Sequence, residues 1–205
     1  MKILAFTDNH GSFTAIKKAA ALAKKKKVDV IVHCGDISVF SKDLDKLIDE
    51  VGKIGLPVLI LHGNHEEASE MKKAVERNKH NIFFLHKAAL SLDGVMFIGY
   101  GGGGFALKDP IFQKQAKVFK KAIEVARKKI PNLKIVFVAH GPPYGTKLDK
   151  VIDSHVGCKD YVDFVKKNKI DIMFCGHIHE CEGKQDKIGN TLIVNPGHYG
   201  MVFET

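Results

Sequence analysis

The chain has 205 residues, of which 45% are hydrophobic and 27% are charged, a composition typical of a globular protein and unlike that of a disordered or fibrous one. Lys and Arg number 32 against 23 for Asp and Glu, a net charge of +9, yet only Arg77 and Arg127 carry the planar guanidinium that contacts phosphates and guanine edges at two points. The charge balance therefore argues against sequence-specific binding of nucleic acid, and the Lys-rich stretches are interpreted as solvated helix faces.

The sequence also argues against a membrane or secreted protein. No apolar run approaches the ~18 residues that a membrane span needs. The first residues, MKILAFTD, have one basic residue and a short apolar run, which makes a poor signal peptide and a good first strand. We therefore expect a cytoplasmic protein. The cysteines lack the spacing of a zinc knuckle or a disulfide framework, and Cys34 and Cys175 are expected to be buried as small hydrophobic residues.

Apolar, β-branched runs alternate with amphipathic stretches along most of the chain, a pattern typical of strand–helix–strand units in a largely parallel sheet. The main predicted strands cover residues 2–7, 29–34, 57–61, 134–139 and 171–175. The predicted helices cover residues 14–27, 42–53, 66–77, 112–129 and 157–167. Shorter β-like pieces at 82–84, 89–92, 95–100, 191–194 and 199–203 are assigned to meander strands of a second sheet. Because no repeat or linker divides the chain, residues 1–205 are expected to form a single domain.

Polar residues that could bind a metal ion follow each of the main predicted strands. The motifs, in chain order, are TDNH at 7–10, HCGD at 33–36, HGNHE at 62–66, AHGPP at 139–143 and CGHIH at 175–179. In open α/β sheets, ligands bind beyond the carboxyl ends of the strands, so these loops should converge on one place. The 11 histidines of the chain are then largely explained as a cluster in space.

The donor set at these strand ends indicates two metal ions. Two Asp, one Asn and four His exceed what one tetrahedral ion can use, and a carboxylate such as Asp36 can bridge two cations. Mixed nitrogen and oxygen donors without a thiolate suit Mn, Fe, Zn, Co or Ni better than Mg or Ca. Two such ions, roughly 3.5 to 4 Å apart, lower the pKa of a shared water and hold the attacking and leaving oxygens of an in-line displacement. The residues therefore predict a binuclear hydrolase of phosphoesters.

The same motifs resemble those of the calcineurin-like metallophosphoesterase superfamily. They are Asp8-x-His10, Gly35-Asp36, Gly63-Asn64-His65-Glu66, His140 and Gly176-His177-x-His179. The resemblance implies an α/β fold, a four-layer α/β/β/α sandwich of two mixed β-sheets flanked by helices. It also implies two divalent ions, with manganese favoured among the metals named above.

The resemblance assigns a role to each of these side chains. One ion is expected to be held by Asp8, His10, Asp36 and His179, and the other by Asp36, Asn64, His140 and His177. His65 resembles the family histidine that lies beside the metals without binding them. Its expected role is to donate a hydrogen bond or proton to the phosphoryl or leaving-group oxygen while a metal-bridging hydroxide attacks.

The substrate is expected to be a small phosphoester. Protein phosphatases of this superfamily carry Gly-Asp-x-Val-Asp-Arg-Gly, whereas Asp36 is followed here by residues 37–42 with the sequence ISVFSK, so a phosphoprotein substrate is not expected. The later motifs are similar to those of small stand-alone phosphodiesterase-like members, which implies phosphodiester, nucleotide-like or small phosphomonoester substrates. Two alternatives stay open: a non-catalytic scaffold on the same fold, and a nuclease that exploits the basic charge.

Several residues near the predicted site can be interpreted as structural or as functional. Glu66 is interpreted as a favourable charge in the first turn of the next helix rather than as a support for a metal ligand, and Asn64 as the cap of that helix. Residues 101–104, all Gly, could let backbone amides approach a phosphate or could form a turn. His155 is expected to begin a helix near the mouth of the site, and His198 to line the pocket or stand in an exposed turn. His33, His62, His80 and His86 are interpreted as structural.

Overall fold

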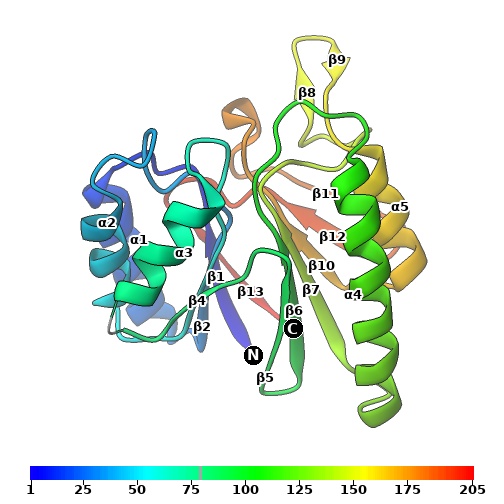
Figure 1. The fold of residues 1–205 in the computed structure, drawn as a ribbon, viewed down its shortest axis with the longest axis horizontal. Coiled ribbons are helices and arrows are strands. Elements are labelled where there is room, and N and C mark those ends of the chain that lie inside the picture. The colour runs from blue at the N-terminus through cyan, green and yellow to red at the C-terminus, as the bar shows by residue number, and fades with distance from the viewer. Residues whose placement is uncertain (79) are drawn as a thin grey trace.

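Two large β-sheets lie face to face in the computed structural model of the chain, which describes residues 1–78 and 80–205, and helices cover both outer faces (Figure 1). The first sheet has the order β13 (Met201–Glu204), β1 (Lys2–Phe6), β2 (Val30–His33), β3 (Val58–Ile60) and β4 (Ile82–Phe84). The second has the order β11 (Gln185–Ile188), β12 (Thr191–Val194), β10 (Ile172–Phe174), β7 (Lys134–Ala139), β6 (Val95–Tyr100) and β5 (Ala88–Leu92).

The helices divide between the two sheets. On the first sheet lie α1 (Phe13–Lys26), α2 (Leu44–Gly52) and α3 (Ala68–Arg77), and on the second lie α4 (Pro110–Lys129) and α5 (Lys159–Asn168) (Figure 1). A small hairpin of β8 (Lys150–Val151) and β9 (Ser154–His155) projects beyond the second sheet, and a 3₁₀ turn spans His179–Cys181. None of the helices in the part of the chain described here is long and apolar enough to cross a membrane.

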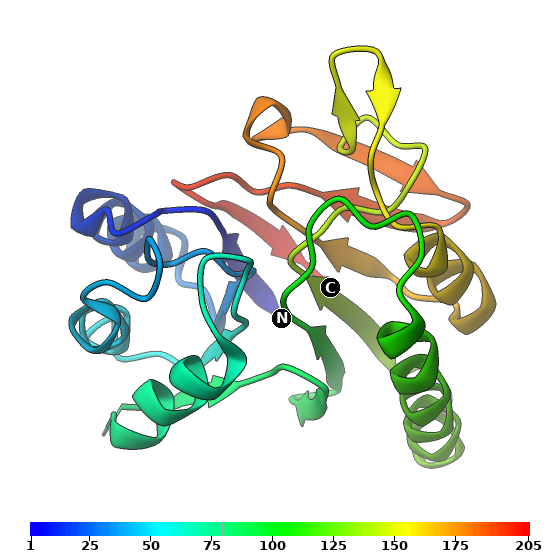
Figure 2. The same ribbon diagram turned by 45° about the horizontal axis from the view of Figure 1, so that its top comes forward.

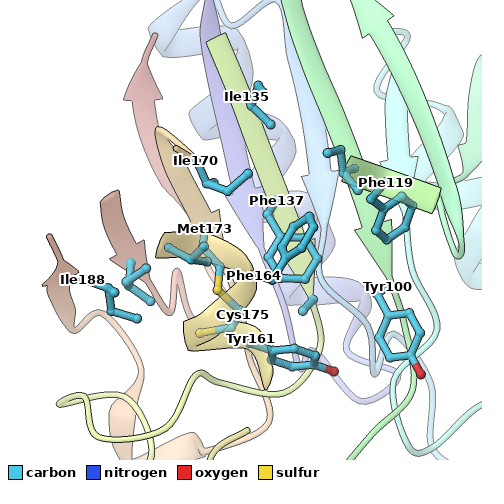
Figure 3. Packing of buried hydrophobic residues seen from close by; sticks show 14 of the residues in the cluster. Tyr100, Phe119, Ile135, Phe137, Tyr161, Phe164, Ile170, Met173, Cys175 and Ile188 are labelled. Carbon is cyan, nitrogen blue, oxygen red and sulfur yellow. The ribbon is translucent and has the colours of Figure 1, made fainter. Parts of the chain in front are cut away.

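Alternation of side chains along the strands produces the layers. Along β1, Ile3 and Ala5 face the second sheet, whereas Leu4 and Phe6 pack under α1 and α2, because successive residues of a strand point to opposite faces. In β7, the odd-numbered residues of 135–139 join the cluster beneath α4 and α5, which also contains Phe119 and Phe164 (Figure 3). Three apolar layers therefore separate four layers of secondary structure, which confirms the predicted α/β/β/α sandwich.

The main predicted strands lie within one residue of the observed β1, β2, β3, β7 and β10 at each end, and the predicted helices lie within two residues of α1 to α5. Hydrophobic runs buried on both faces make these strands easy to recognise. Two of the shorter strands were assigned to the wrong sheet: β4 pairs parallel with β3, and β13 pairs antiparallel with β1, so both belong to the first sheet. The short strands β8, β9 and β11 were not predicted.

The parallel strands β1, β2, β3, β7 and β10 all run toward the same end of the molecule (Figure 1). When that end is turned toward the viewer, the loops that follow these strands lie around one area at the junction of the two sheets (Figure 2). The sandwich therefore brings together the polar motifs that the sequence analysis singled out.

Packing between the sheets should dominate the stability of this fold. Phe97 of β6 is fully buried in the layer between the sheets, whereas Phe83 of β4 is 41% exposed. Phe97→Ala is expected to lower the free energy of unfolding in urea by about 3–5 kcal/mol, because it removes a large apolar side chain and leaves a cavity. Phe83→Ala is the matched control and should lower the free energy of unfolding clearly less. Equal losses in the two variants would contradict the dominant role of the layer between the sheets.

Candidate metal centre

Backbone geometry at the strand ends is unusual for residues other than glycine. Asp8 (φ 51°), His10 (φ 42°), Asp36 (φ 54°) and His177 (φ 70°) all adopt the left-handed region. This conformation costs free energy for residues with a side chain and persists where the surrounding structure fixes it, typically at functional sites. The chain therefore bends sharply directly after β1, β2 and β10, at the positions predicted to carry metal ligands.

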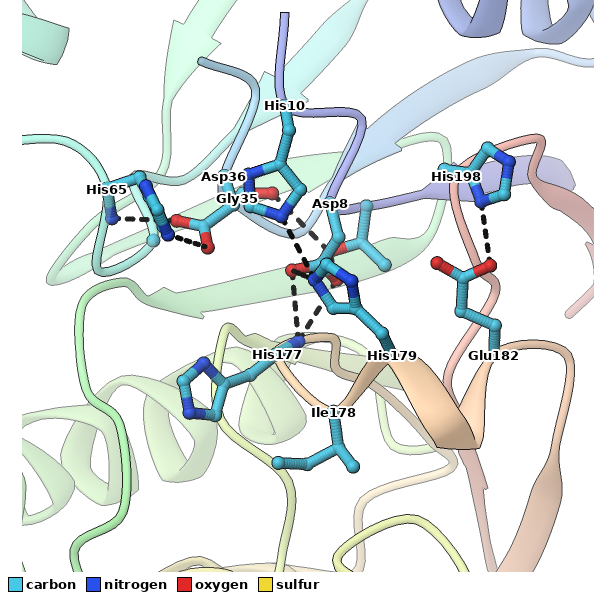
Figure 4. Close-up of polar contacts among 12 residues, drawn as sticks. Asp8, His10, Gly35, Asp36, His65, His177, Ile178, His179, Glu182 and His198 are labelled. Carbon is cyan, nitrogen blue, oxygen red and sulfur yellow. Dashed lines mark hydrogen bonds and ion pairs between the residues drawn. The ribbon is translucent and has the colours of Figure 1, made fainter. Parts of the chain in front are cut away.

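The first group of donor atoms consists of Asp8, His10 and His179, whose ligand atoms all lie within 4.8 Å of one another. The Nε2 atoms of His10 and His179 are 3.0 Å apart, and His179 Nε2 is 3.8 Å from Asp8 Oδ1 (Figure 4). The backbone N–H of His177 donates to Asp8 Oδ2 at 3.0 Å, so the loop after β10 in the second sheet fixes a carboxylate of the first. The His179 side chain is half exposed, which leaves this group open to solvent.

The second group consists of Asp36, His140 and His177, again within 4.8 Å. His140 Nε2 lies 3.3 Å from Asp36 Oδ2 and 3.0 Å from Asn64 Oδ1. The Nδ1–H of His140 donates to the carbonyl oxygen of Cys34 at 3.0 Å, which directs Nε2 into the site. Both Asp36 and His140 are buried, so this group is the enclosed half of the centre.

Asp36 connects the two groups. Its carboxylate also forms a set with His10 and His65 in which the ligand atoms lie within 4.8 Å. The backbone N–H of His65 donates to Asp36 Oδ1 at 2.9 Å, and His65 Nε2 lies 4.0 Å from Asp36 Oδ2 (Figure 4). The eight site residues named from the sequence therefore form one cluster. The Asp36 carboxylate groups with His10, His65, His140 and His177, whereas Asp8 and His179 are joined to it through His10 and Asn64 through His140.

The protonation states of these groups fit metal binding. Burial alone would raise the pKa of Asp36, but the hydrogen bond and charge of His140 lower it to about 2. Burial alone would lower the pKa of His140, but its hydrogen bond to Asp36 and the charges of Asp8 and Asp36 raise it to about 9. A divalent cation held by this pair would take the place of the proton on His140.

The environment of His177 also fits a metal ligand. Its Nε2 atom is buried and has no hydrogen-bond partner among the described residues. Burial, reinforced by the neighbouring His140, lowers the pKa of His177 to about 4, so the ring is neutral at physiological pH. A neutral imidazole with an unpartnered buried nitrogen is suited to ligate a metal ion, and the donors of the site therefore fit divalent cations.

Glu66 supports the site, and its interpretation as a helix charge is wrong. Helix α3 begins at Ala68 with Glu67 as its N-terminal cap, so neither Glu66 nor Asn64 lies where it was expected. The buried Glu66 carboxylate accepts hydrogen bonds from the backbone N–H groups of Asp36 (3.2 Å), Ser38 (2.8 Å) and Gly63 (2.9 Å). It therefore holds the loops that follow β2 and β3 together.

Asn9 is a supporting residue that the sequence analysis missed, although it lies between two predicted ligands. The Gly35 N–H donates to His33 Nδ1 at 3.2 Å, so the Nε2–H of His33 donates to Asn9 Oδ1 at 2.6 Å. Asn9 Nδ2 in turn donates to the carbonyl oxygen of Ile37 at 3.2 Å. Burial lowers the pKa of His33 to about 3. A neutral His33 thus joins the loops after β1 and β2.

Other residues near the predicted site take structural roles. His155 lies in β9 rather than at a helix start, and its Nδ1 is 2.8 Å from Asp149 Oδ1. His198 lies beside the centre and its Nδ1 is 2.7 Å from Glu182 Oε2 (Figure 4). Cys34 and Cys175 are buried and free, as predicted.

The first two glycines of the run at 101–104 form hydrogen bonds within the protein. The Gly101 N–H donates to His86 Nδ1 and the Gly102 N–H to the carbonyl oxygen of His62, both at 2.9 Å. A Cβ on Gly101 would lie 2.6 Å from His62 Nδ1. These two amides are therefore engaged by the protein itself, and the structural interpretation of His62 and His86 agrees with this packing.

Comparisons with known proteins agree with the geometry. Residues 1–181 match the family model described as calcineurin-like phosphoesterase. An uncharacterized protein of Methanocaldococcus jannaschii is 32% identical in an alignment of 205 positions that covers 96% of this chain and 88% of that relative. The structure of TT1561 of Thermus thermophilus has a TM-score of 0.72 at 18% identity, over 96% of this chain and 88% of that one. A dimetal phosphatase of Danio rerio has a TM-score of 0.67 at 11% identity, over 95% and 86%. At these identities the two structures show a shared fold.

The loops after β2 and β3 approach each other so closely that position 63 requires glycine. A Cβ added to Gly63 would overlap the Asp36 side chain and lie 2.6 Å from Asp36 Cγ. Gly63→Ala should therefore displace this carboxylate and weaken binding of Mn²⁺ or Co²⁺, measured by calorimetric titration, by about 10-fold or more. Gly104→Ala is the matched control, because no atom lies within 4 Å of a Cβ there. Unchanged affinity in Gly63→Ala would contradict a role for Asp36 in metal binding.

Burial of neutral His33 should make the chain sensitive to acid. The pKa of His33 is about 3 in the folded chain, against an ordinary value of 6.5. Below pH 6.5 the unfolded chain therefore binds a proton at this position that the folded chain does not bind. The free energy of unfolding falls as the pH drops below 6.5. Between pH 7 and pH 5, wild type should lose about 2 kcal/mol more stability than His33→Gln, which does not titrate. Urea unfolding with chelator present measures this difference. A His33 NMR titration with a midpoint near 6.5 would refute it.

Proposed function

The chain belongs to the calcineurin-like phosphoesterase family, and from this premise we propose that it is a divalent-metal-dependent phosphoesterase that favours phosphodiesters over small phosphomonoesters. The observation that carries the proposal is the position of Asp36 between two groups of nitrogen and oxygen donors. One ion would be held by Asp8, His10, Asp36 and His179, and the other by Asp36, Asn64, His140 and His177. Manganese is favoured, with Fe, Zn, Ni and Co as the other ions that suit these donors.

When bound, such ions activate water and neutralise charge on the phosphoryl group. The side chains of this chain prepare the site for that chemistry. Asp36 is ionised over the whole physiological range because its pKa is about 2, and His177 is neutral because its pKa is about 4. The hydrogen bond from His140 Nδ1 to the Cys34 carbonyl keeps the other ring nitrogen facing Asp36. The site therefore needs little rearrangement to hold cations.

His65 is proposed to act on the leaving group. Its backbone N–H is fixed on Asp36 Oδ1, its ring is partly exposed, and Nε2 lies near the carboxylate that connects the two donor groups. A proton or hydrogen bond donated from this ring would stabilise the oxygen that leaves the phosphorus. An alkoxide leaving group needs this assistance more than an aryloxide, because the alkoxide is the stronger base.

Both arginines lie in contacts that do not involve the site residues. Arg77 forms an ion pair with Asp45 at 2.7 Å, and Arg127 donates to the carbonyl oxygens of Asn168 and Lys169 at 2.8 Å. A guanidinium clamp on the substrate phosphate is therefore absent from the proposed mechanism, which favours a small ester over a phosphoprotein. The intact donor set argues against a non-catalytic scaffold, and the engaged arginines argue against a nuclease. The single domain and the cytoplasmic location stay predictions.

The proposed activity is tested with purified protein loaded with Mn²⁺, Co²⁺ or Ni²⁺. Hydrolysis of bis(p-nitrophenyl) phosphate should exceed that of p-nitrophenyl phosphate and should stop when a chelator is added. Failure to hydrolyse either ester with any of these metals would overturn the proposal.

His65→Ala should separate catalysis from metal binding. We expect kcat for a diester with an alkoxide leaving group to fall by about 10²- to 10⁴-fold, with a smaller loss for a p-nitrophenolate leaving group. Metal content, measured by elemental analysis, should stay at the wild-type level. His80→Gln, at a position between α3 and β4, is the matched removal of a histidine away from the site and should retain full activity. Loss of metal from His65→Ala would make His65 a ligand instead.

A further inference from the structure

Two phenylalanines stand exposed beside the proposed centre. Phe40 is 79% exposed and its ring centroid lies 4.8 Å from that of His65. Phe105 is 68% exposed and its ring centroid lies 4.9 Å from that of His177. Neither residue belongs to any of the three apolar layers. Such large apolar rings are usually buried, so their position at a site full of polar groups calls for an explanation other than packing.

The structure holds Phe40 in a defined and strained place. Phe40 (φ 49°) and Ser41 (φ 58°) both adopt the left-handed region, which is a rare conformation for a bulky residue. The Ser41 N–H donates to the carbonyl oxygen of His65 at 3.1 Å, and Ser38 is held by Glu66. The loop after β2 thus presents the Phe40 ring next to His65 at a conformational cost, as is typical of functional positions.

Hydrogen bonds also hold the loop that carries Phe105. The Tyr100 hydroxyl donates to Asp109 at 2.9 Å, and the Asp109 N–H donates to Asp160 at 2.7 Å. The Lys159 N–H donates to the carbonyl oxygen of Leu107 at 2.9 Å. These contacts join the segment between β6 and α4 to the start of α5. Phe105 is therefore presented by a loop that is tied on its carboxyl side to a helix of the second sheet.

The two rings flank the centre from different sheets. Phe40 contacts His65, which belongs with Asp36 and His10, whereas Phe105 contacts His177, which belongs with Asp36 and His140. A phosphodiester has two ester arms on its phosphorus and a monoester has one, so two separate rings match a diester. His65 is the proposed donor to the leaving oxygen, which places the leaving arm on the side of Phe40 and the retained arm on the side of Phe105.

We propose that Phe40 and Phe105 are aromatic platforms that bind planar rings on the two ester arms, so that the substrates are phosphodiesters bearing aryl or nucleobase groups. This inference rests on the proposed function and names its substrate class. Stacking of a base on an aromatic side chain is worth about 1–3 kcal/mol by alanine substitution, does not depend on the identity of the base, and needs no arginine. It therefore suits a chain whose two guanidinium groups are engaged elsewhere.

The test compares diesters that share a p-nitrophenyl leaving group and differ in the retained arm, which is methyl, phenyl or thymidine. Wild type should prefer phenyl and thymidine over methyl. In Phe105→Ala, the ratio of kcat/KM for the thymidine diester to that for the methyl diester should fall by about 5- to 100-fold, through KM rather than kcat. Phe105→Tyr should restore the ratio, and Phe105→Leu should not. Phe40→Ala should lower kcat/KM for all three diesters, because they share the aryl leaving arm.

Binding without turnover provides a second readout. Calorimetric titration of the metal-loaded protein should show tighter binding of phenylphosphonate than of methylphosphonate. This preference should shrink in the Phe40→Ala, Phe105→Ala double variant and persist in Phe83→Ala, an exposed phenylalanine on β4 away from the centre.

The outcomes separate the two proposals. If wild type hydrolyses none of the diesters, the proposed phosphodiesterase function fails. If it hydrolyses all of them with no preference for ring-bearing arms, the enzyme stands and the platforms are refuted. Full retention of the preference in Phe105→Leu would indicate general apolar contact and would also overturn the aromatic assignment.

Discussion

The contact between the two sheets is the constraint on which the site depends. Asp8, His10, Asp36, Asn64 and His65 follow strands of the first sheet, whereas His140, His177 and His179 follow strands of the second. Hydrogen bonds cross this junction from His140 Nδ1 to the Cys34 carbonyl, from His140 Nε2 to Asn64 Oδ1 and from the His177 N–H to Asp8. The apolar layer between the sheets therefore fixes the distance between the two halves of the donor set as well as stabilising the fold.

Burial and charge pairing act in opposite directions on Asp36 and His140, and the pair therefore depends on the packing of the two sheets against each other. Burial disfavours the charge on both side chains, yet each holds the other in its charged form, with pKa values of about 2 and about 9. A buried ion pair of this kind recovers its desolvation cost only when further hydrogen bonds satisfy the remaining atoms. The His65 N–H donates to the carboxylate, and the His140 ring donates to the Cys34 carbonyl oxygen and to Asn64 Oδ1, so ligands and supporting backbone form one network.

The parallel strands and the ligand positions could be predicted from the sequence because both leave a local pattern. Apolar runs buried on two faces define β1, β2 and β7, and the motifs stand directly after them. The sheet membership of β4 and β13 could not be predicted, because edge pairing is decided by tertiary contacts. The role of Glu66 left no pattern either, since its partners are backbone amides of loops brought together only in the folded chain.

The uneven exposure of the centre bears on how specificity can arise. His140 and Asp36 are buried, whereas the His179 side chain is 54% exposed, so the first donor group includes the more accessible part of the centre. In the proposed mechanism, the histidines and the cations that they would hold compensate the charge of the phosphoryl group, which is common to every phosphoester. Under this proposal, discrimination among phosphoesters depends on side chains outside the donor set, and the exposed rings of Phe40 and Phe105, on the loops after β2 and β6, lie in contact with His65 and His177.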